Sequence, residues 1–227
     1  GFFLQFPEQN GQGVVIDSTD ILKYATLKNF NKDEGTLSFW VSPNWNGNEQ
    51  AVRSLFDIKN PSDNNNTFRA GKWWGASPQT SQGYLYWNNS DSSGSGCNGF
   101  WEVNSAKPSS GLGEPLLVQK WRPGEWHYVT LAWNYRVTTP FIRLYIDGVF
   151  VSEKIASAAC VFNPVNSEMW FGTNSPGTNQ INATLDEIRI LDIQKTGEGI
   201  QKDFLSGLAA HQANNPPFYC ERENQYA

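Results

Sequence analysis

The most informative stretch of the sequence is Phe141-Ile-Arg-Leu-Tyr-Ile-Asp-Gly-Val-Phe-Val151, which encodes a β-hairpin. Its first half alternates, so that Ile142, Leu144 and Ile146 share one face of a strand. Asp147-Gly148 suits a tight two-residue turn, because both central residues of such a turn need positive φ. The sequence therefore predicts that the segments on either side of this turn pair as antiparallel strands.

Short alternating runs of the same kind recur along the chain, separated by Gly, Pro, Asn and Asp. Strands are predicted at 2–6, 12–17, 36–42, 52–58, 66–72, 82–88, 99–104, 126–134, 149–155, 168–173 and 183–191. Helical periodicity is nearly absent, and one short helix is predicted at 197–206. The pattern indicates an all-β protein with enough strands for two packed sheets.

Composition excludes several classes of protein. Hydrophobic residues make up 39% of the 227 residues and aromatic residues 14%, which is typical of a chain that folds around a core. The net charge is -5 and no window gathers Lys or Arg, so we expect no nucleic-acid partner. No stretch approaches the roughly 18 consecutive apolar residues of a membrane span, so we expect no membrane insertion.

Sequons favour an extracellular setting, whether secreted or on a cell or particle surface, while the three cysteines leave the redox compartment open. Cys97, Cys160 and Cys220 lack the CxxC spacing of thiol metal sites and allow at most one internal disulfide. Asn-x-Ser/Thr sequons lie at Asn65, Asn88 and Asn182. The high Trp content and the single Met point the same way.

Five stretches in order carry a family resemblance. They are Glu34-Gly-Thr-Leu-Ser-Phe-Trp-Val-Ser-Pro43, Gly124-Glu-Trp-His-Tyr-Val-Thr-Leu-Ala-Trp133, Ile142-Arg-Leu-Tyr-Ile-Asp-Gly-Val149, Met169-Trp-Phe-Gly172 and Ala183-Thr-Leu-Asp-Glu-Ile-Arg-Ile-Leu-Asp192. Their order and spacing resemble the laminin-G-like branch of the concanavalin A-like jelly rolls, over nearly the whole chain. The resemblance implies a two-sheet antiparallel jelly-roll sandwich. It also implies binding to glycans or to other proteins, often with calcium.

One domain accounts for most of the chain. We assign residues 1–206 to the jelly roll, with a Ser/Gly-rich loop insertion at 89–114. Residues 207–227 are predicted to be a polar C-terminal extension. The insertion and the extension depart from the family pattern.

Catalysis is not expected, although some members of the superfamily degrade polysaccharides. A retaining glycosidase needs two carboxyl groups about 5 Å apart, and adjacent Asp186 and Glu187 would point to opposite faces of a strand. His127 is the sole strand histidine and is predicted to be structural. Its strand is apolar on both faces, so the strand is either central and covered on both sides, or its outer face lines a groove.

Asp186 is the first candidate for a calcium ligand. Strand alternation predicts that it shares a face with Ile188 and Ile190, where a carboxylate needs a partner. That partner is either a backbone N–H group or a calcium ion, which takes six to eight oxygen ligands. Further oxygens could come from the turn residues Asp17, Asp20, Asp57 and Asp63.

Tryptophans in polar segments are the candidate ligand-binding residues. These are Trp45, Trp73, Trp74, Trp87 and Trp101. Indole rings can stack on the apolar faces of sugar rings, while nearby Asn, Gln and Asp side chains can bind the hydroxyl groups. The alternative is that these rings cover loops or the core.

The sequence thus favours a non-catalytic extracellular domain that binds a polysaccharide or glycan, with calcium as a possible structural ion. The alternative is a structural or adhesive subunit of an extracellular appendage, fibre or viral coat, whose partners are neighbouring protein subunits. A polysaccharide-degrading enzyme comes third.

Overall fold

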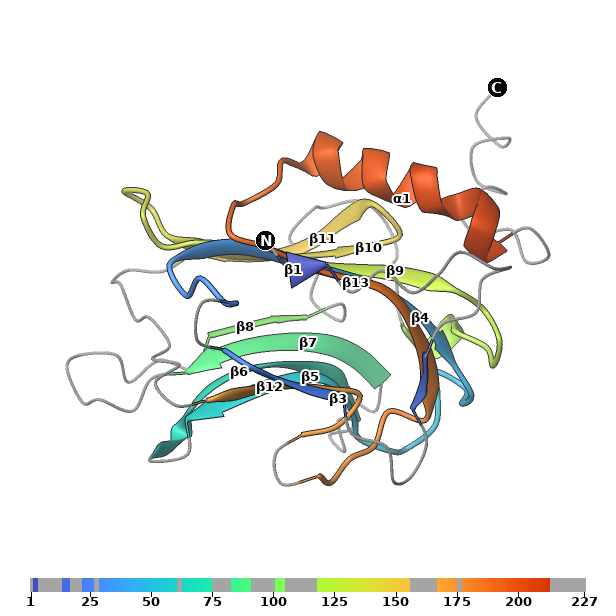
Figure 1. The fold of residues 1–227 in the computed structure, drawn as a ribbon. Coiled ribbons are helices and arrows are strands. Elements are labelled where there is room, and N and C mark those ends of the chain that lie inside the picture. The colour runs from blue at the N-terminus through green and yellow to red at the C-terminus, as the bar shows by residue number, and fades with distance from the viewer. Residues whose placement is uncertain are drawn as a thin grey trace.

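The chain folds as two antiparallel β-sheets with one helix lying across the outer face of one of them (Figure 1). The computed structural model describes residues 2–3, 14–16, 22–26, 29–60, 63–74, 83–90, 101–104, 118–155, 167–174 and 177–212. The predicted all-β jelly-roll sandwich is confirmed. Strands predicted from alternation all have counterparts, and the structure adds a short strand at Leu22–Ala25.

Sheet A has seven strands among the described residues. Its order is β1 (Phe2–Phe3), β13 (Ala183–Leu191), β4 (Glu34–Pro43), β9 (His127–Asn134), β10 (Phe141–Ile146) and β11 (Val149–Ile155), and β2 (Val14–Ile16) also pairs with β13. Strands far apart in the sequence are therefore neighbours in this sheet.

Sheet B has six strands among the described residues. Its order is β3 (Leu22–Ala25), β12 (Glu168–Phe171), β5 (Arg53–Asn60), β6 (Asp63–Trp74), β7 (Gly83–Ser90) and β8 (Trp101–Asn104). A 3-10 turn, η1 (Val118–Lys120), precedes β9. Most of the predicted insertion at 89–114 lies outside the described residues, apart from the end of β7 and the strand β8.

The predicted hairpin is present. β10 and β11 pair antiparallel, with Ile146 opposite Val149. The turn residues Asp147 and Gly148 have φ values of 52° and 74°, the left-handed conformation that the turn requires. The Asp147 carboxylate also accepts the backbone N–H of Tyr128 at 2.7 Å, which ties the turn to β9.

The core lies between the sheets and takes one face of the strands whose side chains the structure describes. In sheet A it includes the predicted faces Leu37, Phe39 and Val41 of β4 and Ile142, Leu144 and Ile146 of β10. In sheet B it includes Phe56, Ile58, Phe68, Met169 and Phe171. Leu22 and Tyr24 of β3 pack against its edge.

β9 is central and covered on both faces, which settles the alternative left open by its sequence. Val129, Leu131 and Trp133 face the core between the sheets. Tyr128 and Ala132 face the other way, into a second cluster that includes residues of helix α1.

Helix α1 (Gly197–Gln212) covers the outer face of sheet A (Figure 1). Thr196 caps its start, because the Thr196 hydroxyl accepts the N–H of Gly199 at 3.2 Å. Ile200 and Phe204 bury their side chains against the sheet. The helix runs six residues beyond its predicted end, so the first part of the expected polar extension is helical, and residues 213–227 lie outside the described part. Within the described residues, no helix is both long and apolar enough to span a membrane.

Candidate functional site

Trp45 does not stand in an exposed turn. Its side chain is only 3% exposed, and its indole N–H donates to the Ile181 carbonyl at 2.7 Å. Its ring lies roughly parallel to that of Trp121, with centroids 6.2 Å apart. The polar sequence around Trp45 forms a turn whose aromatic side chain packs inward, so this ring offers no surface to a ligand.

Trp73 is 45% exposed, on the outer face of sheet B. Strand alternation explains its position, because Phe68 and Ala70 of β6 point into the core and odd-numbered neighbours point outward. Trp side chains are enriched at interfaces, so this exposed indole is the described candidate for ligand contact.

The other three candidate tryptophans lie on β6, β7 and β8, the last three strands in the order of sheet B. Trp74 ends β6, opposite Gly83, while Trp87 of β7 pairs with Ala70 and Val103, and Trp101 of β8 pairs with Asn89. Their side chains lie outside the described part of the structure. The backbone therefore brings Trp73, Trp74, Trp87 and Trp101 onto three adjacent strands and leaves Trp45 in the core.

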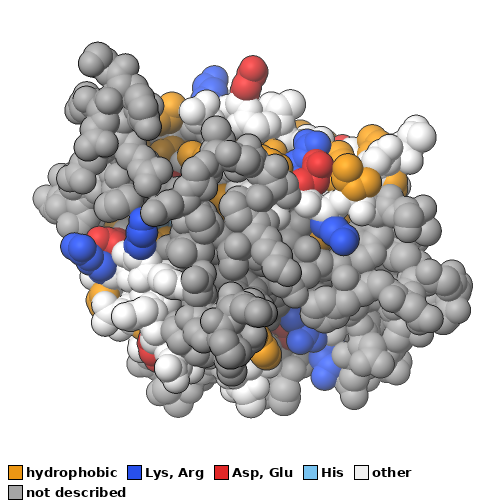
Figure 2. All heavy atoms as spheres, turned by 180° about the vertical axis from the view of Figure 1, so that it is seen from behind, with side chains coloured by type: hydrophobic (Ala, Val, Ile, Leu, Met, Phe, Trp, Pro, Cys, Tyr) orange, Lys and Arg blue, Asp and Glu red, His pale blue; other side chains and the backbone are white. Residues whose placement is uncertain are grey.

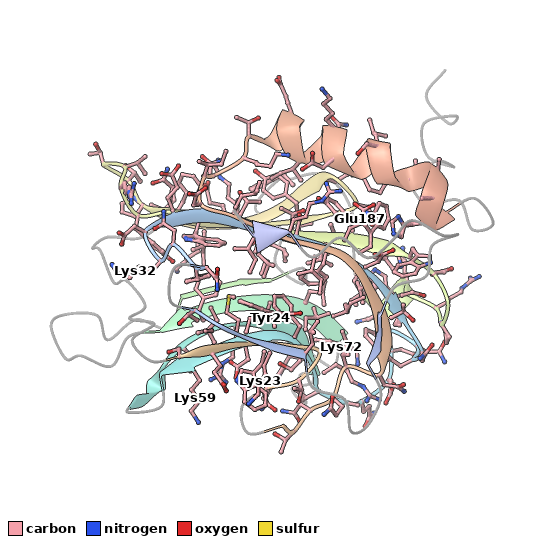
Figure 3. All side chains as sticks on the ribbon, in the orientation of Figure 1. Lys23, Tyr24, Lys32, Lys59, Lys72 and Glu187 are labelled. Carbon is pink, nitrogen blue, oxygen red and sulfur yellow. The ribbon has the colours of Figure 1, made fainter. Side chains whose placement is uncertain are left out.

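A row of charged and aromatic side chains crosses the same outer face. Lys23, Trp170, Asp57 and Arg69 are successive cross-strand partners on β3, β12, β5 and β6. The ammonium group of Lys23 lies 5.4 Å from the Trp170 ring centroid and 3.4 Å from the Glu168 carboxylate. In Figure 3, Lys23 points away from sheet A, on the outer side of sheet B. We call these four side chains the outer row.

Sequence reasoning did not select Lys23, Arg69 or Trp170 as site residues. The alternation of Glu168-Met-Trp-Phe171 does place Trp170 opposite to the buried Met169 and Phe171. The alternation does not show which strands lie next to each other, because β3, β12, β5 and β6 are adjacent only in the folded sheet.

Asp57 lies in the outer row rather than in a loop. It is 1% exposed, and its Oδ1 is 3.5 Å from the Nε of Arg69. A guanidinium group beside a carboxylate supplies the positive charge that a metal ion would otherwise provide. The environment of Asp57 therefore differs from the turn that the sequence predicted.

Asp186 faces helix α1, which corrects the predicted side of the strand. A bulge interrupts the pairing of β13 with β4 between Asp186 and Arg189, and Glu187 has a φ of 46°. The extra residue puts Ile188 in the core and Asp186 on the opposite face. There Oδ1 accepts the N–H of Glu187 at 2.7 Å, and Oδ2 lies 3.1 Å from the Nε2 of His211.

The predicted calcium set is not assembled from the described residues. Asp186 belongs to sheet A and Asp57 to sheet B. Asp17, Asp20 and the side chain of Asp63, in β6, lie outside the described part. Within that part no group of three or more His, Cys, Asp or Glu side chains could hold a metal ion. Calcium binding stays a prediction.

His127 lies at the end of the core, 8% exposed and stacked on Trp121 with centroids 4.1 Å apart. Its Nδ1 is 3.0 Å from Asp147, and its Nε2 is 3.8 Å from Glu125. Burial lowers the pKa of this ring, but the charges and hydrogen bonds of Asp147 and Glu125 outweigh it, so the pKa of His127 is raised. These contacts are those of a paired structural histidine.

The fold and the matched residues identify the family. The model of the concanavalin A-like lectin/glucanase superfamily, laminin-G-like branch, matches residues 17–201. The chain belongs to this superfamily.

Solved structures of the same fold include binding domains of botulinum neurotoxins. The binding domain of botulinum neurotoxin DC in complex with SialylT has a TM-score of 0.60 and 15% identity, covering 91% of this chain and 45% of that one. The serotype D binding domain has a TM-score of 0.53 and 12% identity, covering 86% and 42%. The chain described here thus spans less than half the length of those two neurotoxin chains. No curated protein matches its sequence.

On the face drawn in Figure 2, the charged side chains of the described residues do not gather in one patch. Figure 2 shows Lys and Arg side chains scattered over one face of the molecule and interspersed with Asp and Glu side chains.

Proposed function

We propose that the chain is a non-catalytic carbohydrate-binding domain that acts outside the cell or on a surface, and that it binds its ligand on the outer face of sheet B. The observation that carries the proposal is Trp73, an indole ring 45% exposed on a sheet face. The ring would stack on the apolar face of a sugar, and the outer row would supply hydrogen bonds to hydroxyl groups. The glycan complex of a botulinum neurotoxin binding domain of this fold supports the choice of ligand class.

The distance from Trp73 to the outer row suggests an extended ligand. Arg69 lies four residues before Trp73 on the same face of β6. At a rise of about 3.3 Å per residue, the two positions are about 13 Å apart along the strand. A single sugar ring is shorter than this, so we propose an oligosaccharide or polysaccharide chain as the ligand.

The first prediction concerns Trp73. Replacing Trp73 with Ala should weaken binding on a glycan array about tenfold or more, because a central aromatic anchor contributes at least about 1 to 2 kcal/mol. Leu205→Ala is a matched control, because Leu205 is 57% exposed but lies on α1, across the molecule. The array should be run with calcium and with chelator, which also tests the predicted calcium ion.

Glycan binding that W73A leaves unchanged would contradict this site, and the absence of binding to any glycan would contradict the function. The alternative, assembly with neighbouring protein subunits, is favoured by exposed apolar side chains in sheet A, in α1 and in the segment between β13 and α1. These are Ile155, Ile193 and Leu205, each more than half exposed. Size measurement in parallel separates the two, because a subunit would form concentration-dependent assemblies.

A further inference from the structure

The C-terminal end of helix α1 is fastened to sheet A by His211. The imidazole ring is 6% exposed and lies flat on the indole of Trp40 in β4, with centroids 4.3 Å apart and an interplanar angle of 5°. The edge of the Trp126 ring, just before β9, contacts it with centroids 4.9 Å apart. This histidine is thus enclosed by residues from three segments of the chain.

Both nitrogens of the His211 ring face hydrogen-bond acceptors. Nδ1 is 2.9 Å from the Gly207 carbonyl oxygen, and Nε2 is 3.1 Å from Oδ2 of Asp186. A carbonyl oxygen and an ionised carboxylate only accept, whereas a neutral imidazole carries a single N–H. The two hydrogen bonds therefore exist together only when the ring is doubly protonated and positively charged.

The ring lies between a fixed carboxylate and the face of an indole. Asp186 is held in place because its Oδ1 accepts the N–H of Glu187 at 2.7 Å. The indole face of Trp40 attracts a cation. Two further ion pairs lie on the adjoining elements, Glu187 with Arg189 on β13 and Asp203 of α1 with Lys195. Among the described contacts of the ring, Asp186 is the titratable partner.

We propose that His211 and Asp186 form a proton-dependent latch that holds the last turns of α1 on sheet A. Histidine changes its charge between about pH 5 and pH 8. With the proton bound, the ring donates to both Gly207 and Asp186. When the proton leaves, one of these bonds is lost, and a buried acceptor faces a nitrogen lone pair.

Loosening should be confined to the end of the helix. The first half of α1 is anchored independently, by the Thr196 cap and by the burial of Ile200 and Phe204. Near the end, Gly207 sits against the Trp40 indole. Release of residues 207–212 would therefore uncover Trp40 while leaving the rest of the sandwich intact.

Amide hydrogen exchange on the intact chain tests the latch. Protection of the amides in 207–212, corrected for intrinsic exchange rates, should fall about tenfold between about pH 6 and about pH 8.5, since one charged hydrogen bond is lost. In the variants His211→Gln and Asp186→Asn, this pH-dependent fall in amide protection should disappear. His127→Gln is the matched control, because His127 is also stacked on a tryptophan and paired with a carboxylate but lies away from α1, and it should retain the fall.

Equal protection of 207–212 in the wild-type chain at both pH values would overturn the proposal. So would a fall that persists in H211Q and D186N. Should H211Q not fold, D186N decides, because Asn keeps the shape of Asp and its oxygen still accepts the Glu187 N–H.

Discussion

Lys72 is a charged residue in the interior, and it shows how one side chain can hold a loop. It is fully buried, and its Nζ donates to the Ala51 carbonyl at 3.0 Å and also to that of Glu49. The same Nζ lies 5.2 Å from the centroid of the Trp45 ring. Burial lowers the pKa of Lys72 to about 8. The lysine thus secures the turn that carries Trp45 at the cost of burying an ammonium group.

Stability should therefore depend on pH through Lys72. The unfolded chain holds this proton up to about pH 10.5 and the folded chain only to about pH 8. Because the unfolded state binds more protons in between, the free energy of unfolding should rise from about pH 8 to about pH 9.5, by at most about 1.4 kcal/mol per pH unit for one group.

Urea unfolding of Lys72→Met measures this contribution. The variant removes the ammonium group but keeps most of the side-chain length, so the rise in the free energy of unfolding with pH should be lost. Lys59→Met, on the outer side of sheet B, is the control and should keep it (Figure 3). Equal slopes in the wild type and K72M would show that Lys72 is not the source.

At the level of elements, the contact between α1 and β4 depends on a missing side chain. A Cβ atom at Gly207 would lie 2.7 Å from the Nε1 of Trp40, closer than real Cβ contacts allow. A Cβ atom at Gly199, in the first turn of the same helix, would meet its nearest side-chain atoms at 3.4 Å. Of the three glycines in α1, Gly207 is therefore required by close packing, whereas Gly199 is not.

Alanine at these two positions should act in opposite directions. Gly207→Ala should lower the free energy of unfolding by about 1 kcal/mol, because overpacking costs about 1 to 3 kcal/mol and helix propensity returns about 1 kcal/mol. Gly199→Ala should raise it by up to about 1 kcal/mol. Denaturant unfolding of both variants checks this, and a G207A protein as stable as G199A would refute the close packing.

At the scale of the whole molecule, a series of stacked rings joins the two sheets. It runs from Lys72 of β6 through Trp45 and Trp121 to His127 of β9. Beyond His127 the series ends on Asp147, in the turn of the β10–β11 hairpin. Loss of the contact between His127 and Asp147 should therefore lower the free energy of unfolding of the whole sandwich.

The raised pKa of His127 sets the direction of a second pH effect. A group whose pKa is higher in the folded state stabilises the fold below its unfolded pKa, near 6.5, and loses that stabilisation as pH rises through the folded value. Global unfolding monitored from about pH 5 upward should show this decline in the wild type and a shallower one in His127→Gln. Parallel profiles would mean that the pKa of His127 is the same in the folded and the unfolded chain.

The alternation of apolar residues was sufficient to predict the two-sheet architecture. Strand faces such as Leu37, Phe39 and Val41, and the turn at Asp147-Gly148, follow from period and φ preference, which are local properties. The start of α1 was predictable for the same reason. Its end was not, because the last turns are held by Trp40 and Asp186, which come from other parts of the chain.

Long-range contacts account for what local pattern missed. Trp45 reads as an exposed turn residue, yet Ile181 and Trp121 bury it. Asp186 reads as a core-facing residue, yet the bulge at Glu187 turns it toward His211. The period of the apolar residues and the conformational preferences of turn residues are local properties, so both can be predicted from the sequence. Burial, bulges and the choice of partners depend on residues that meet only when the two sheets and the helix pack together.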